Sequence, residues 1–292
     1  MSRFDALGQS HEVELGQGTV RYRERGSGEP LVFLHGVLVN GDLWRNVVPR
    51  VAEQGYRCIV PDLPLGAHEV PLREDADLSP PGLARLIADF TRALDLERPT
   101  AVANDTGGGL VQIAVAEDPA LFGRLVLTSC DAFEHFFPLM FKYLSVSARI
   151  PGSITLLRHS TKLKAVRRAP FGFGWLMNEA PPPKVRESWI EPLADPRVRR
   201  DVTKVLRGID KRHTLAAAER LGAFQGPVLL AWGEKDRIFP LEDAKKLAEI
   251  FPDARLRTFP GAQAFVPEDA PEELAREIVE FVRDTQPARS SA

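Results

Sequence analysis

The 292-residue chain contains little cysteine and no long apolar run. Its two cysteines, Cys58 and Cys130, lie at the ends of short apolar segments, so we expect buried free thiols in a reducing compartment rather than a disulfide or a metal pair. No run approaches the roughly 18 apolar residues of a membrane span, and the N-terminus lacks the apolar core of a signal peptide. These absences predict a cytoplasmic protein with no membrane partner.

An excess of either charge is also missing. The chain has 38 Lys and Arg residues against 40 Asp and Glu residues, a formal net charge of -2, which gives no basic field for nucleic acid. The sequence has no metal-binding cluster and no dinucleotide fingerprint, and the glycines at 107–109 lack the lysine of a phosphate-binding loop. We therefore predict no nucleic-acid partner, no metal and no cofactor.

The chain does have short apolar segments that alternate with helical periodicity. Residues 31–34 form a continuously apolar run, which is typical of a strand buried on both faces of a parallel sheet. A hairpin at 11–25 precedes it, and the pattern recurs at 58–60, 100–103, 125–127 and 228–231. Helical spacing covers residues 43–51, 83–96, 110–116, 241–250 and 273–282. The alternation predicts an α/β fold with a doubly wound, mostly parallel sheet.

Residues 133–223 interrupt this alternation. They have the pattern of helices and turns without a clear buried strand, and they are rich in aromatic residues. We predict a helical cap here, inserted into a core formed by residues 1–132 and 224–285, with a disordered tail at 286–292. A single aromatic residue in such a segment most often packs cap onto core, but together they predict an apolar cleft under the cap.

A strand–turn–helix elbow is expected at residues 103–108, Ala-Asn-Asp-Thr-Gly-Gly. Small residues on both sides of Asp105 suit a tight turn in which the strand and helix backbones approach closely. The Asp105 carboxylate would project from the carboxyl edge of the sheet, toward the positive end of the next helix. An ordinary helix N-cap is the alternative, and the flanking glycines favour a nucleophile position instead.

These features resemble the α/β-hydrolase superfamily, and specifically its aspartate-nucleophile branch of haloalkane dehalogenases, fluoroacetate dehalogenases and epoxide hydrolases. The resemblance covers residues 11–128 and 224–284. Besides the elbow, it rests on His35-Gly36, on Pro-Asp-Leu-Pro at 61–64 and on Trp-Gly-Glu-Lys-Asp at 232–236. It implies an α/β-hydrolase fold with an inserted helical cap.

The resemblance also implies roles for single residues. Asp105 would be the nucleophile and Asp236 the acid of the triad, with Asp131 as the alternative acid. The backbone N–H groups of Val37 and Thr106 would form the oxyanion hole. We expect the substrate pocket to include His35, Asn104, His135, Phe136, Trp175 and Phe265.

The chain departs from this family at the position of the catalytic histidine. Residues 259–269 read Phe-Pro-Gly-Ala-Gln-Ala-Phe-Val-Pro-Glu-Asp, which places Ala264 at that position, and no histidine follows His213. An ester on Asp105 could form without the base, but its hydrolysis needs one. Either the histidine was replaced deliberately, or another residue such as His135 serves as base, or the reaction is not hydrolysis.

We therefore expect a cofactor-free, hydrolase-like enzyme that acts on a small apolar molecule, as a monomer or homodimer. It would resemble haloalkane dehalogenases or epoxide hydrolases, with Asp105 as nucleophile and a non-standard triad. Two alternatives remain open. Asp105 could be the acid or base of a lyase, isomerase or cyclase, because burial can raise a carboxyl pKa. The chain could also be a ligand-binding protein on a hydrolase scaffold.

Overall fold

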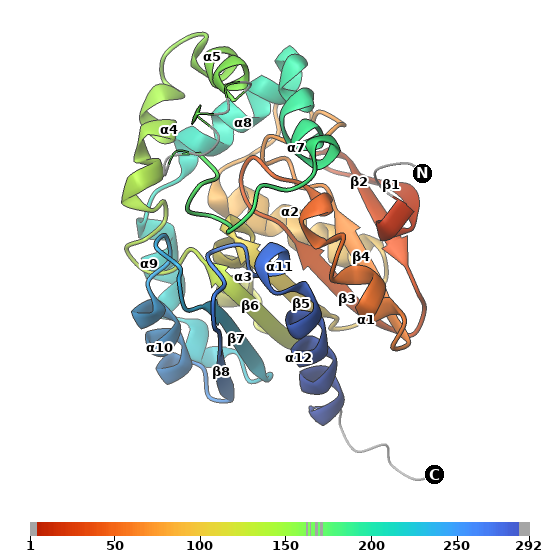
Figure 1. Cartoon of the computed structure of the whole chain (residues 1–292). Coiled ribbons are helices and arrows are strands. Elements are labelled where there is room, and N and C mark those ends of the chain that lie inside the picture. Colours follow the sequence, from red (N-terminus) through yellow and green to blue (C-terminus); the bar gives the residue numbers. More distant parts are fainter. Residues whose placement is uncertain (1–4, 162, 164, 167–168, 170–171, 286–292) are drawn as a thin grey trace.

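The protein, as a computed structural model, is described for residues 5–161, 163, 165–166, 169 and 172–285. This part contains one sheet in the strand order β1-β2-β4-β3-β5-β6-β7-β8 (Figure 1). Strands β1 and β2 run antiparallel to their neighbours, and all other neighbouring pairs are parallel. The strands are β1 Gln9–Leu15, β2 Gly18–Arg25, β3 Glu29–Leu34, β4 Tyr56–Pro61, β5 Thr100–Asp105, β6 Arg124–Cys130, β7 Val228–Gly233 and β8 Ala254–Phe259. The predicted doubly wound, mostly parallel sheet is confirmed.

The central strands are buried on both faces. Every residue of β5, β6 and β7 is buried, which explains their continuously apolar sequences. Strand β8 lies at the sheet edge, and its residues alternate between partly buried and exposed positions. Because β8 lacks a continuous apolar run, its range could not be predicted from the sequence.

Helices cover both faces of the sheet (Figure 1). Helices α1 and α12 contact each other, and α3 contacts α2 and α9. The predicted helix at 43–51 is wrong in extent: a 3-10 turn, η2 Gly41–Trp44, comes first, and α1 begins at Val48. Pro49 has no N–H group and therefore fits the first turn of α1 rather than a helix interior. The helices of this part are α1 Val48–Ala52, α2 Pro80–Ala93, α3 Thr106–Glu117, α10 Leu241–Ile250, α11 Val266–Asp269 and α12 Pro271–Asp284, with η1 Asp5–Leu7.

Between β6 and β7 the described residues of 133–223 form helices and turns without a strand. These helices are η3 Leu139–Phe141, α4 Lys142–Ser147, α5 Ser153–Ser160, α7 Pro183–Ile190, η4 Glu191–Ala194, α8 Pro196–Gly208, α9 Arg212–Ala218 and η5 Leu221–Ala223. Helices α4, α5, α7 and α8 lie beyond one end of the sheet, whereas α9 returns along its side and contacts α3 (Figure 1). The division into core and cap stays a prediction, as does the monomer or homodimer. The predicted tail at 286–292 lies outside the described residues. No helix among the described residues is long and apolar enough to cross a membrane.

Candidate active site

Asp105 occupies a sharp turn between β5 and α3. Its backbone has φ 54° and ψ −134°, a conformation that costs a non-glycine residue about 1–3 kcal/mol. The pairing register of β5 with β6 shifts between Asn104 and Asp105. The turn also needs glycine next to it, because a Cβ on Gly107 would lie 2.6 Å from the His35 carbonyl oxygen. The elbow sequence therefore produces a strained turn that presents the Asp105 side chain.

The Asp105 carboxylate is held on one side by its neighbour in α3. Its Oδ1 accepts hydrogen bonds from the Thr106 backbone N–H at 2.7 Å and from the Thr106 hydroxyl at 3.3 Å. The other oxygen, Oδ2, lies against Gly36, where an added Cβ would be 2.2 Å away. Gly36 therefore makes room for the carboxylate, which a side chain at this position would displace.

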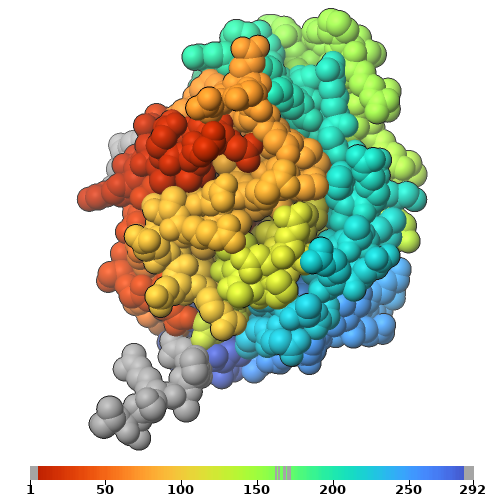
Figure 2. Space-filling view, turned by 180° about the vertical axis from the view of Figure 1, so that it is seen from behind, coloured from red at the N-terminus to blue at the C-terminus, as the bar shows by residue number. Residues whose placement is uncertain are grey.

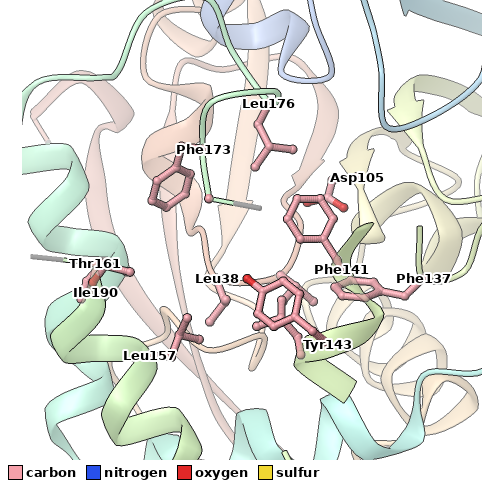
Figure 3. Close-up of a pocket in the computed structure, with 13 residues that line it drawn as sticks. Leu38, Asp105, Phe137, Phe141, Tyr143, Leu157, Thr161, Phe173, Leu176 and Ile190 are labelled. Atoms are coloured by element: carbon pink, nitrogen blue, oxygen red, sulfur yellow. The ribbon is translucent and has the colours of Figure 1, made fainter. Parts of the chain in front are cut away.

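An apolar cavity of about 70 Å³ opens in front of Asp105. A single water molecule needs about 10–15 Å³, so the cavity can hold a small organic molecule. Figure 3 shows aromatic and aliphatic side chains around this space, with Asp105 at its wall. The lining residues are Val37, Leu38, Asp105, Phe137, Phe141, Tyr143, Leu144, Leu157, Thr161, Gly172, Phe173, Leu176 and Ile190.

Burial raises the pKa of Asp105 to about 7. Loss of hydration is the largest cause, the two hydrogen bonds from Thr106 oppose it, and the nearby Asp236 carboxyl adds to the rise. Asp105 therefore exchanges its proton near neutral pH. This property suits proton transfer, and it means that the nucleophilic carboxylate becomes more abundant as the pH rises.

Asp236 lies after β7, and only one of its two carboxylate oxygens accepts hydrogen bonds from the described residues. Its Oδ1 accepts hydrogen bonds from the backbone N–H groups of Ile238 at 2.7 Å and Phe239 at 2.9 Å. Its Oδ2 is buried and has no hydrogen-bond partner among the described residues. Burial raises the pKa of Asp236 to about 6, against the effect of the two N–H groups and the Ser129 hydroxyl. This carboxyl therefore has an acceptor atom without a donor.

Ala264 is fully buried beside the elbow. Its carbonyl oxygen accepts a hydrogen bond at 3.0 Å from the side chain of Asn104, the residue before Asp105. The same loop contacts β7, because a Cβ on Gly233 would lie 2.3 Å from the Gln263 carbonyl oxygen. The position at which the family resemblance places a histidine thus lies next to Asn104 and the end of β7, with a methyl group in its place.

Asp131, the alternative acid, is completely buried after β6. Neither of its carboxylate oxygens has a hydrogen-bond partner in the described part of the chain. Burial raises the pKa of Asp131 well above its ordinary value, and the nearby Asp105 carboxylate adds to this rise. Its surroundings therefore favour the protonated form of the Asp131 carboxyl.

Two of the six expected pocket residues hold the backbone in place. The His35 ring contacts the Gly36 carbonyl oxygen at 2.9 Å through Nδ1 and accepts the Leu63 N–H at 2.9 Å through Nε2. Burial lowers the pKa of His35 to about 4, so the ring is neutral. Asn104 donates to carbonyl oxygens of Thr128, Ser129 and Ala264. Neither side chain lines the cavity at Asp105.

The other four expected pocket residues also lie outside the cavity lining. His135 Nδ1 pairs with Asp243 Oδ2 at 2.5 Å, which directs this ring toward α10. Phe136 is buried beside Gly109, and Trp175 stacks under Arg237, whose guanidinium carbon is 5.4 Å from the ring centre. Phe265 packs edge-on against Trp189. The structure therefore brings Asp105, Val37 and the lining side chains together, and it places these four around them.

Most of the lining side chains come from the segment between β6 and β7, whose aromatic residues together predict an apolar cleft. Phe137, Phe141, Phe173 and Leu176 belong to an aromatic-rich segment, but composition cannot tell which of its side chains face a cavity. No group of three or more His, Cys, Asp or Glu side chains among the described residues is placed to bind a metal ion.

Comparison with known proteins adds a family and several relatives. Residues 29–271 match the model of the alpha/beta hydrolase fold family. Haloalkane dehalogenase 2 of Mycobacterium tuberculosis is 29% identical over 279 residues, which cover 93% of this chain and 94% of the relative. The non-heme chloroperoxidase CPO-A1 of Kitasatospora aureofaciens is 27% identical over 272 residues, which cover 89% of this chain and 94% of the relative.

Solved structures show the same fold. The crystal structure of haloalkane dehalogenase DbeA from Bradyrhizobium elkani superposes with a TM-score of 0.76 at 20% sequence identity, and the match covers 95% of this chain and 98% of that one. The sheet order and the helices on both faces agree with this likeness.

Proposed function

Because the chain belongs to the α/β-hydrolase fold family, we propose that it is a cofactor-free enzyme of the haloalkane dehalogenase and epoxide hydrolase type that acts on a small apolar molecule. The main observation in favour is the position of Asp105. It is the one carboxylate among the described residues that line the apolar cavity, and a strained elbow presents it there. The dehalogenase among the relatives supports the same reaction class.

In the proposed first step Asp105 Oδ2 attacks an sp³ carbon of the substrate. A C–O ester bond forms, and the carbon–halogen bond breaks with its electron pair leaving on the halide, or a carbon–oxygen bond of an epoxide opens with the charge on oxygen. The Thr106 N–H stays on Oδ1, at 2.7 Å in the free protein. Together with the backbone N–H of Val37 it would hold an oxyanion when the ester is later attacked.

The second step, hydrolysis of the ester, needs a base that activates water. Ala264 has no such group, and losing one member of a catalytic triad costs roughly 10⁴–10⁶-fold in rate in the serine-protease precedent. The ester on Asp105 is therefore expected to persist, and turnover is expected to be slow or absent with ordinary haloalkanes.

A second candidate is acid–base catalysis without a covalent intermediate. The pKa of Asp105, about 7, favours this candidate, because a carboxyl that gains and loses its proton near neutral pH is suited to isomerisation, elimination or cyclisation. Here Asp105 would deliver or accept a proton on a substrate held by the apolar walls.

Intact mass spectrometry after incubation with a series of haloalkanes and epoxides separates the two candidates. If Asp105 is a nucleophile, we expect an adduct on Asp105 that forms faster as the pH rises through about 7, because the ionised carboxylate is the reacting form. Asp105→Asn should form none. If no electrophile modifies Asp105 at any pH, the covalent function is excluded and acid–base catalysis remains.

A further inference from the structure

Exposed apolar side chains are concentrated in one short stretch of the chain. Among the described residues, every large hydrophobic side chain that is exposed lies between residues 139 and 163. Such residues are normally scattered over a surface, and a concentration of them marks a contact surface. They are Leu139 at 80%, Tyr143 at 40%, Val146 at 61%, Ile150 at 61%, Leu156 at 70% and Leu163 at 61% exposure. We call the described residues of 139–163 the α4–α5 surface.

The charge on this stretch has one sign. Residues 135–178 contain seven Lys and Arg residues and no Asp or Glu, although the whole chain carries a slight acidic excess. Lys142 and Arg149 are exposed next to the apolar side chains of α4. Figure 2 shows the yellow-green atoms of this part at the upper margin of the molecule, where they project beside α8.

A cleft between this surface and α8 adds further positive charge. Ile150 borders it, together with Arg199, Arg200, Lys204 and Arg207. Three of these cations hydrogen-bond to backbone carbonyls and form no ion pair in the described part of the chain: Arg199 with Leu193 and Ala194, Lys204 with Glu74 and Ala76, and Arg207 with Ala148. Their charge is therefore not neutralised by a bonded carboxylate.

We propose that the α4–α5 surface docks on an anionic phospholipid bilayer. Aliphatic side chains such as Val146, Ile150 and Leu156 would enter the boundary of headgroups and acyl chains, while the cations would contact phosphate groups. The core of a protein interface is depleted of charged residues, whereas Lys142 and Arg149 are exposed next to the apolar side chains of α4. Docking of this kind needs no membrane-spanning segment, so it is compatible with the lack of a long apolar helix in the described chain. It departs from the sequence-based expectation of no membrane partner, which rested on the lack of a long apolar run.

The same helices form part of the cavity wall. Phe141, Tyr143, Leu144 and Leu157 belong to the α4–α5 surface or its underside and also line the space in front of Asp105. A lipophilic molecule dissolved in the bilayer would therefore lie on the other side of a wall of the cavity in front of Asp105. This consequence rests on the proposed function, whereas the docking itself does not.

Flotation with vesicles of two compositions tests the docking without any activity measurement. We expect the full chain to float with equimolar phosphatidylcholine and phosphatidylglycerol, with an affinity at least about ten-fold higher than for phosphatidylcholine alone, and to release as salt is added. The affinity of the triple variant Val146→Ser, Ile150→Ser and Leu156→Ser for the anionic vesicles should be lower than that of the wild type by about ten-fold or more. The affinity of Arg149→Glu for the same vesicles should be about ten-fold lower than that of the wild type.

Arg276→Glu is the matched control for the charge reversal. It changes the net charge by the same amount at an exposed position of α12, away from α4 and α5 (Figure 1). It should alter vesicle affinity less than about two-fold. Circular dichroism should show that all variants fold, because every changed side chain is exposed.

Two results would overturn the proposal. The first is no flotation with anionic vesicles by a folded wild-type chain. The second is equal flotation of wild type and the triple variant. If the wild type self-associates in sedimentation experiments and the triple variant does not, in the absence of vesicle binding, the α4–α5 surface is an interface between copies of this chain.

Discussion

Replacing Ala264 with histidine should restore the missing half of the proposed reaction. Asp236 Oδ2 is a buried acceptor without a donor in the described chain, and Ala264 is the buried residue at the position of the family's histidine. A histidine here would gain Asp236 as the carboxylate that orients its ring and would be the base for the attacking water.

The magnitude follows from two opposed effects on stability and one on rate. Adding a ring to a packed site costs about 1–3 kcal/mol, and satisfying a buried acceptor recovers about 1–3 kcal/mol, so the variant should fold. A positioned general base contributes about 10²–10⁴-fold. The lifetime of an ester on Asp105 should fall by at least about 100-fold.

The assay follows the adduct mass over time after excess haloalkane is removed. Ala264→Gln is the control, because glutamine has similar size and can hydrogen-bond to Asp236 but cannot accept a proton from water. The reasoning is refuted if the Ala264→His adduct lasts as long as the Ala264→Gln adduct while both proteins remain folded. If the wild type releases product at once, another residue already serves as the base.

Three further outcomes are expected. An acid whose pKa is higher in the folded state stabilises the fold less as the pH rises from its ordinary value, 3.8, to its folded value, about 7 for Asp105. Over that pH range the free energy of unfolding of the wild type should therefore fall by an amount on the order of 1–4 kcal/mol more than that of Asp105→Asn, as measured by urea unfolding of both proteins at each pH. An equal pH dependence of the two proteins would contradict this. Gly36→Ala should slow alkylation by more than about 100-fold, because its Cβ would occupy the place of Asp105 Oδ2, 2.2 Å away; an unchanged rate by mass spectrometry would show that the carboxylate moves freely. Asp131→Asn should leave the pH midpoint of alkylation and the melting temperature nearly unchanged, because the raised pKa of Asp131 disfavours its ionised form; a large shift of either would mean that Asp131 ionises in the fold.

The sheet and the elbow could be predicted because their signals are local. Continuous apolar runs correspond to β5, β6 and β7, which are buried on both faces. The Asp-Thr-Gly-Gly sequence likewise matches its strained turn, because only small residues allow strand and helix to approach so closely. Edge strand β8 has no such signal, because two of its six side chains are exposed and only one is fully buried.

The sequence by itself determined that a doubly wound sheet presents Asp105 at its carboxyl edge and that no histidine follows in the expected loop. Both are properties of neighbouring residues along the chain. The tertiary structure alone decided which side chains form the cavity wall, that His135 pairs with Asp243 and that Asp236 Oδ2 has no partner in the described chain. These features depend on how helices far apart in sequence pack across the sheet. Packing also excludes water around Asp105 and so moves its pKa to about 7, which no residue pattern encodes.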